Sequence, residues 1–294
     1  MTPEEIRKQS YLKAVKLEKL IDQVEKRIGR ASSELTKTML KDFLQKLTVE
    51  QGKVIAQFNR RTLTLFNQAF KTYQETTKTD LINSIVGDIN SILNDNDSFY
   101  KKTAPGYNLD KADIKTLLDR RLGIDDNGNL IKQGYMNGLL DDTSIRSEIQ
   151  KFVFKEMFRA SGFESFKKGL KIFIEGDKEK FGLFQKHYKT FSYDAYAQLN
   201  SYTSGVYANK LGMYHFIYNG GLIKTSREFC IERNGKVFST EEAEEWKDDE
   251  DLKAISDTES YNWLIDRGGY NCRHSIDFIA PEIAYVLRPD LKGK

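Results

Sequence analysis

The sequence predicts a mainly α-helical protein with a small α+β module at its C-terminal end. Apolar residues recur at helical spacing through most of the first 212 residues, whereas the apolar period changes to two beyond Gly212. Hydrophobic residues make up 39% of the chain and charged residues 30%, which is typical of a globular protein rather than a disordered one. At 294 residues, the chain can bury one large core or two medium-sized cores.

Four consecutive parts are expected. They are an N-terminal helical region (1–93), a linker or loop (94–108), a helical body (109–212) and a C-terminal α+β module (213–294).

The N-terminal region is predicted to begin with a long helix. Thr2 can cap this helix, Pro3 occupies its first position, and Glu5 completes a Thr-x-x-Glu capping box. An apolar stripe follows, and we expect Gly29 to end the helix.

Three further apolar stripes complete this region. They predict one helix from Ser32 or Ser33 to Leu47, and others over 55–70 and 81–93. Because such stripes need partners, we expect the helices to form an array of hairpins or to lie against neighbouring protein subunits.

Polar and turn-forming residues predict the linker over 94–108, which contains Asp-Asn-Asp, Lys-Lys and Ala-Pro-Gly. Beyond it, Leu109–Leu122 is predicted to be a helix and Asp125–Asn129 a turn. A calcium loop is the alternative at 125–129, but the segment lacks the alternating Asp residues and the distal Glu of such loops. Helices resume at Ser144, and a long aromatic-rich helix is expected over 184–207.

The C-terminal module is predicted to contain β-hairpin elements near 213–240. The alternating segment 214–218 indicates a strand, Asn219-Gly220-Gly221 a turn, and Leu222-Ile223-Lys224 the returning strand. Asn234-Gly235 marks a second tight turn before another short strand. Ser239 then begins a capping box with Glu242, so an acidic helix is expected to follow.

Charge is distributed unevenly along the chain. The net charge is +3, but residues 226–294 carry 10 basic and 16 acidic residues, net −6, which leaves +9 on residues 1–225. A basic helical body can approach DNA or an acidic protein surface, although a solvated helical surface explains the same charge.

The composition also bears on location. The longest apolar runs fall short of the roughly 18–20 residues that span a bilayer, and the first residues lack the basic and apolar start of a signal peptide. We therefore expect a protein that is made and kept in a cytoplasm and has no membrane partner. Two cysteines are too few for a secreted disulfide scaffold.

Three short motifs in the last quarter of the chain carry the strongest functional signal. They are Ser-Arg-x-x-Cys at 226–230, Asn-Gly-Lys-Val-Phe at 234–238 and Gly-Tyr-Asn-Cys-Arg-His at 269–274. Together they contain both cysteines of the chain, two arginines and one of its three histidines.

In this order, and with an acidic helix between the last two, the motifs resemble the C-terminal module of the phage Mu F-like family. That family comprises minor head or head-morphogenesis proteins of tailed phages, and the resemblance covers roughly residues 185–280. It identifies a structural motif of the module: Ser226, Arg227, Cys230, Asn234, Gly235, Gly269, Asn271, Cys272, Arg273 and His274.

The resemblance implies a structural virion protein that acts in head morphogenesis, is assembled in the host bacterial cytoplasm and is present in several copies per particle. Its expected partners are the portal protein, the major capsid protein or both, near the portal vertex, with packaged DNA as a further candidate. We expect docking through buried aromatic and aliphatic anchors rather than through a few catalytic groups.

Cys230, Cys272 and His274 could converge if the chain folds back. Two thiolates and an imidazole form a zinc ligand set that lacks one member, and His215 or Asp266 could supply it. Two buried thiols beside a hydrogen-bonded histidine are the favoured alternative, and a disulfide is a third. We therefore expect no cofactor, with a structural zinc ion as the alternative.

An enzymatic module carried in the virion, similar to a nuclease or an ADP-ribosyltransferase, is the alternative function. Its candidates are His274 as acid or base, Arg227 or Arg273 for a phosphate, and Glu228 or Glu232 as a carboxylate. The sequence lacks phosphate-binding loops and the common zinc-protease and serine-hydrolase motifs. We therefore expect no catalytic residues, and both arginines are expected to bond carbonyls and the acidic helix inside the module.

Overall fold

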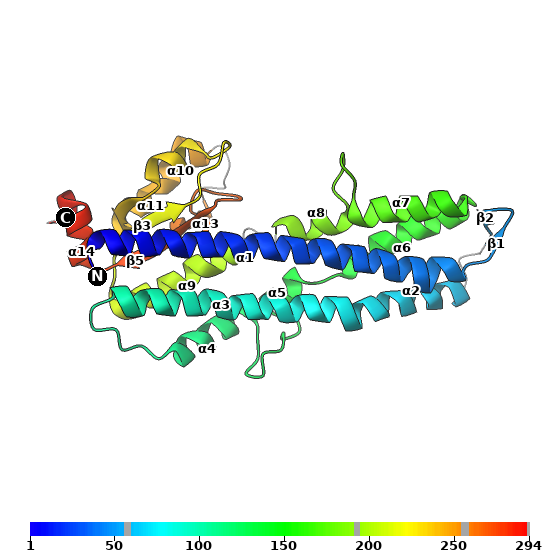
Figure 1. Cartoon of the computed structure of the whole chain (residues 1–294), viewed down its shortest axis with the longest axis horizontal. Helices are drawn as coiled ribbons and strands as arrows, with labels where there is room; N and C mark the ends of the chain where they lie inside the picture. The colour runs from blue at the N-terminus through cyan, green and yellow to red at the C-terminus, as the bar shows by residue number, and fades with distance from the viewer. Residues whose placement is uncertain (56–59, 191–194, 254–258, 293–294) are drawn as a thin grey trace. The chain divides into compact units, whose positions relative to one another are not determined.

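The computed structural model describes residues 1–55, 60–190, 195–253 and 259–292. It confirms the predicted fold class, which is mainly helical with long N-terminal helices and a small antiparallel sheet near the C-terminal end (Figure 1). The chain forms two compact units. We call residues 1–22, 87–135 and 192–294 the sheet unit, and residues 23–86 and 136–191 the helical unit. Neither unit is a continuous stretch of chain, so the predicted consecutive division at 94–108 does not match them.

Helix α1 (Pro3–Thr38) contributes residues to both units. Its predicted capping box is confirmed, because Glu5 N donates to Thr2 Oγ1 at 3.2 Å and Thr2 N donates to Glu5 Oε2 at 2.7 Å. The predicted end at Gly29 is wrong. Buried Ile28 and Ala31 continue the apolar stripe past the glycine, and their packing outweighs the roughly 1 kcal/mol cost of a helical glycine.

Short and medium-length helices build the helical unit. After α1, the chain forms η1 (Met39–Phe43), η2 (Leu44–Lys46), the hairpin β1 (Val49–Glu50) and β2 (Lys53–Val54), α2 (Arg60–Tyr73) and η3 (Gln74–Lys78). Helix α3 (Thr79–Thr103) begins in this unit, and α5 (Tyr135–Leu139), α6 (Thr143–Phe158), α7 (Phe163–Glu175) and α8 (Leu183–Thr190) follow later in the chain. The helix predicted over 55–70 is described from Arg60 onward, and residues 56–59 lie outside the described part.

An aromatic row forms the centre of the helical unit. The rings of Phe43, Phe66, Phe70, Tyr73 and Phe184 each contact the next, with centroid separations of 5.7–6.3 Å. Phe43, Phe66 and Phe70 of the predicted N-terminal stripes are therefore core residues, whereas Ile55 is 42% exposed.

The predicted linker is wrong over 94–103, because α3 continues to Thr103. Its polar residues Asn96 and Asp97 face inward and find partners there. Asn96 Nδ2 donates to Ile92 O at 2.9 Å and to Asn200 Oδ1 at 3.0 Å, and Asp97 accepts a 3.1 Å hydrogen bond from Tyr207. Local composition predicted a loop because it carries no information on these partners across the fold.

The next segment follows the prediction. Helix α4 (Lys111–Leu122) begins after Asp110, whose side chain accepts from Ala112 N at 2.8 Å. The predicted turn at 125–129 is present, and Asp125 Oδ1 accepts from the amides of Asn127 and Asn129 at 2.9 and 2.8 Å. That carboxylate therefore stabilises the turn.

A three-stranded antiparallel sheet organises the sheet unit, with strand order β4-β3-β5. The strands are β3 (His215–Gly220), β4 (Lys236–Ser239) and β5 (His274–Ile279). The predicted returning strand at 222–224 is wrong, because β3 pairs instead with β4, after α10 (Glu228–Arg233). Gly220 lies at the end of β3, where a Cβ would meet Arg273 O and His274 Cα at 2.6 Å. Its role is therefore close approach to β5 rather than a turn.

Helices cover both faces of this sheet. The remaining elements of the sheet unit are α9 (Tyr196–Leu211), α11 (Thr240–Glu244), η5 (Glu245–Asp248), α12 (Glu250–Lys253), α13 (Trp263–Asp266), α14 (Pro281–Leu287) and η6 (Pro289–Leu291). On one face, Phe216 of β3 packs against Trp246 and Trp263. On the other face, Asn219 and Asp277 bond to Ser10 of α1 at 2.9 and 2.6 Å.

Two further predictions concern the elements around the sheet. The capping box of Ser239 with Glu242 is confirmed at the start of α11. The long helix predicted over 184–207 corresponds to α8 and α9, and residues 191–194 lie outside the described part. Among the described residues, no helix is both long and apolar enough to span a bilayer.

Candidate metal centre

Cys230, Cys272 and His274 come together in the sheet unit from three backbone segments. Cys230 lies in α10, Cys272 precedes β5, and His274 begins β5. Arg227, just before α10, donates to Gly268 O at 2.9 Å and to Tyr270 O at 2.5 Å. These two bonds join α10 to the loop that precedes β5, so the two cysteines meet although 42 positions separate them.

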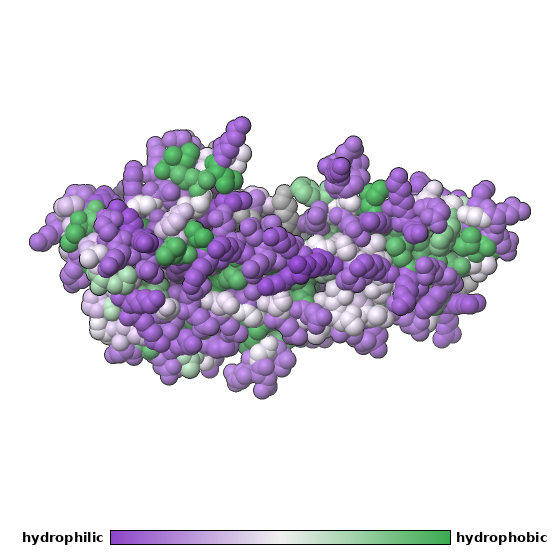
Figure 2. All heavy atoms as spheres, in the orientation of Figure 1, coloured by the Kyte–Doolittle hydropathy of each residue, from purple (hydrophilic) through white to green (hydrophobic). Residues whose placement is uncertain are grey.

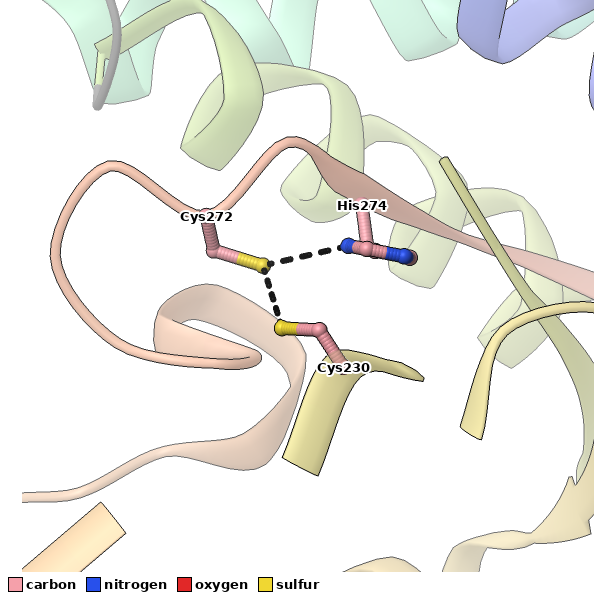
Figure 3. Close-up of side chains that lie close together, drawn as sticks. All are labelled: Cys230, Cys272 and His274. Atoms are coloured by element: carbon pink, nitrogen blue, oxygen red, sulfur yellow. Dashed lines mark hydrogen bonds between the residues drawn. The ribbon is translucent and has the colours of Figure 1, made fainter. Parts of the chain in front are cut away.

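The three side chains point toward one another (Figure 3). The sulfur atoms of Cys230 and Cys272 are 3.9 Å apart, and Cys272 Sγ lies 3.9 Å from His274 Nδ1. The donor atoms all lie within 4.8 Å of one another. Both thiols are free, and all three residues are buried.

Tyr218 is a member of this cluster that the sequence analysis missed. Its hydroxyl lies 3.6 Å from Cys230 Sγ and 3.3 Å from Cys272 Sγ. Its ring stacks on the His274 imidazole, with centroids 4.7 Å apart and planes within 7°. The alternating pattern predicted that Tyr218 is in a strand, but only the pairing of β3 with β5 places it here.

Glycines and a left-handed residue shape the loop that carries Cys272. A Cβ on Gly268 would lie 2.4 Å from Cys230 Sγ and 3.1 Å from Cys272 Sγ, so only glycine fits there. Gly269 and Asn271 have φ values of 81° and 58°, in the left-handed region that these residue types tolerate best. These conformations explain why both belong to the motif.

The pKa values of the two cysteines are shifted in opposite directions. Burial raises the pKa of Cys272, but hydrogen bonds from Cys230 and His274 and the charge of Arg267 outweigh burial, so its pKa lies below the ordinary value. The hydrogen bond to Cys272 and burial both raise the pKa of Cys230. The arrangement therefore favours a thiolate on Cys272 and a thiol on Cys230.

The other motif residues stabilise the module at separate points. Ser226 Oγ accepts from Ile223 N at 2.8 Å, and Asn234 Oδ1 accepts from Gly220 N at 3.1 Å. Gly235, with φ of 74°, donates to Tyr218 O at 2.7 Å in the predicted turn. Arg273 Nη1 bonds to Glu18 of α1 at 2.5 Å. Arg273 therefore joins the module to α1.

The two proposed fourth ligands lie elsewhere. His215 pairs with Ile279, at the opposite end of β5 from His274, and its ring packs on Tyr285. Asp266 Oδ2 accepts from Asn262 N at 2.7 Å. Within the described part of the chain, no further His, Cys, Asp or Glu joins the three-residue group.

Comparisons with protein-family models, curated proteins and solved structures each give no match to this chain.

Proposed function

We propose that this chain is a structural protein of a tailed bacteriophage particle, a minor head protein that acts in head morphogenesis near the portal vertex. The proposal rests on the structural roles of residues from the three motifs. Arg227 bonds two carbonyls of the module, Asn234 caps the end of β3, and Cys230 and His274 are buried. Side chains used in this way maintain a shape, which suits a protein whose function is association.

An exposed apolar surface on the module supports docking. We call Leu222, Ile223, Ile231 and Tyr270 the module patch; each is 45–48% exposed. Figure 2 shows hydrophobic side chains gathered over the α10 region of the molecule. Aliphatic and aromatic side chains of this kind dominate the energy of protein interfaces. On this proposal, the module patch contacts the portal protein or the major capsid protein.

The enzymatic alternative requires its candidate residues, such as His274, Arg227 and Glu232, to contact a substrate. His274 is only 2% exposed, and the guanidinium of Arg227 is bonded to Gly268 and Tyr270. Glu232 lies beside Arg233 at 3.6 Å on the exposed side of α10. This geometry favours the structural role over a nuclease or transferase role.

Deletion of the gene from its phage and rescue with variants tests the proposal. We expect the deletion to give genome-free or non-infectious particles, and the wild-type protein to purify with portal or capsid protein. Ile231→Asp with Tyr270→Asp should keep the fold and fail to rescue. Phe158→Asp, a matched change at an 86% exposed position in the helical unit, should rescue fully.

Normal infectious particles from the deletion would contradict the proposal. Nuclease or NAD-cleaving activity that is lost in His274→Ala would favour the enzymatic alternative. A contact with packaged DNA predicts affinity that falls steeply with salt and is insensitive to DNA sequence.

A further inference from the structure

We propose that Cys230, Cys272 and His274 bind one zinc ion, and that the Tyr218 hydroxyl hydrogen-bonds to a sulfur ligand. The inference concerns how the module is stabilised and does not depend on the proposed phage function. Zinc in proteins prefers thiolate and imidazole ligands in a tetrahedral arrangement, and three protein ligands leave its fourth position to a water molecule.

Two distances between the donor atoms are close to those of a tetrahedral site. Zinc–sulfur bonds of about 2.3 Å place two sulfurs about 3.8 Å apart in a tetrahedron. The observed separation of Cys230 Sγ and Cys272 Sγ is 3.9 Å. With zinc–nitrogen bonds of about 2.0–2.1 Å, a sulfur and a nitrogen are about 3.6 Å apart. The observed distance from Cys272 Sγ to His274 Nδ1 is 3.9 Å.

The Tyr218 hydroxyl lies beside both sulfurs. It is 3.6 Å from Cys230 Sγ and 3.3 Å from Cys272 Sγ, within the range of O–H···S hydrogen bonds. The phenol and imidazole rings are stacked with planes within 7°, so the Tyr218 oxygen lies outside the imidazole plane that would contain a zinc ion bound to His274 Nδ1. Tyr218 is therefore placed to hydrogen-bond to a sulfur ligand rather than to bind the metal.

Burial and backbone shape enclose the site, whereas a catalytic zinc keeps a position open to substrate. Cys230, Cys272 and His274 are 2–3% exposed, and Tyr218 is fully buried. A Cβ on Gly268 would lie too close to both sulfurs, so any side chain at this position would displace them.

A zinc ion here would connect α10, the loop before β5 and β5 itself. A metal that binds only the folded protein stabilises it in proportion to the logarithm of its concentration. The module is therefore expected to fold most stably with zinc bound.

Metal analysis of the full chain, expressed with zinc and purified without chelator, is the first test. We expect about one zinc ion per chain. Cys230→Ser and His274→Asn should lose most of it. His187→Asn, a matched change of a histidine in the helical unit, should retain it.

Cobalt titration of the metal-stripped protein tests the role of Tyr218. We expect the visible bands of tetrahedral Co²⁺ and a sulfur-to-cobalt charge-transfer band in the near ultraviolet. Tyr218→Phe should shift the charge-transfer band, because a sulfur ligand loses a hydrogen bond, and should weaken binding by about tenfold. Tyr270→Phe, on the module surface, should change neither.

Three results would overturn the inference. They are a folded wild-type protein that binds neither zinc nor cobalt, a Cys230–Cys272 disulfide seen by mass in the freshly purified chain, and zinc content unaffected by Cys230→Ser. An unchanged cobalt spectrum and affinity in Tyr218→Phe would show that Tyr218 does not hydrogen-bond to the sulfur ligands. If the cysteine variants do not fold, wild-type protein decides: removal of zinc must lower the melting temperature, and zinc must restore it.

Discussion

The ion pair between Lys13 of α1 and Asp277 of β5 should be the most sensitive contact of the sheet unit. Both residues are buried, at 5% and 0% side-chain exposure. Asp277 also accepts a 2.6 Å hydrogen bond from Ser10, which in turn accepts from Asn219 at 2.9 Å. Lys13→Met would leave this carboxylate charged and uncompensated in the interior.

The expected cost follows from this burial. Removing one partner of a buried ion pair costs about 3–5 kcal/mol, because the remaining charge has no counterion. With a urea slope of about 3 kcal/mol per M, the midpoint should fall by about 1 M or more. Both tryptophans of the chain, Trp246 and Trp263, lie in the sheet unit, so tryptophan fluorescence reports its unfolding.

A double-mutant cycle isolates the interaction. Asp277→Asn alone should also destabilise the unit, and the double variant should cost less than the sum by about 1–3 kcal/mol. Lys16→Met is the matched control on the same helix, because Lys16 pairs with Asp95 at 2.7 Å but is 62% exposed. It should cost less than about 1 kcal/mol. If Lys13→Met is as mild as Lys16→Met, or if the two single effects simply add, the argument from burial fails.

Three further predictions concern single positions. Gly268→Ala should destabilise the module by about 1–3 kcal/mol because its Cβ would overlap Cys230 Sγ. Gly29→Ala should instead stabilise α1 by up to about 1 kcal/mol. Urea unfolding of the two variants should therefore show changes in stability of opposite sign. Arg227→Lys should cost about 1–3 kcal/mol, since an ammonium cannot reproduce the guanidinium's two bonds to carbonyls, and a melting temperature equal to that of wild type would contradict this. Burial lowers the pKa of His215 below 6.5, although two nearby glutamates act to raise it. The unfolded chain therefore binds this proton at a higher pH than the folded chain does, so stability should fall as the pH drops below 6.5. His215→Gln should reduce that fall in thermal melts taken across pH 6.5, and an unchanged pH dependence would show that another group is responsible.

Local signals predicted the elements well where the deciding interactions were local. The capping boxes at Thr2 and Ser239, and the turn after Asp125, depend on contacts within five residues and are all present. The prediction that α1 ends at Gly29 is wrong because the packing of the neighbouring residues outweighs the local helix-ending signal. The prediction of a loop over 94–103 is wrong because polar residues of this segment have partners more than 100 positions away, on α9.

The candidate site was predictable only in part. Residue type alone indicates the two cysteines and His274 as candidate ligands. Their convergence could be predicted only on the assumption that the chain folds back. The fold achieves this by pairing β3 with β5 and by the bonds of Arg227, rather than by the predicted hairpin. Tyr218 lies 54 positions from Cys272, so no local pattern could indicate their contact.

The assignment of α1 to both units limits how this chain can be divided experimentally or exchanged during evolution. The predicted C-terminal module starts at residue 213, yet Ser10, Lys13 and Glu18 supply partners for its buried Asn219 and Asp277 and for Arg273. A fragment limited to the C-terminal third would place those polar groups on an uncovered sheet face. A chimaera that swaps this third between homologues should therefore carry the first 22 residues with it, as a single inherited piece.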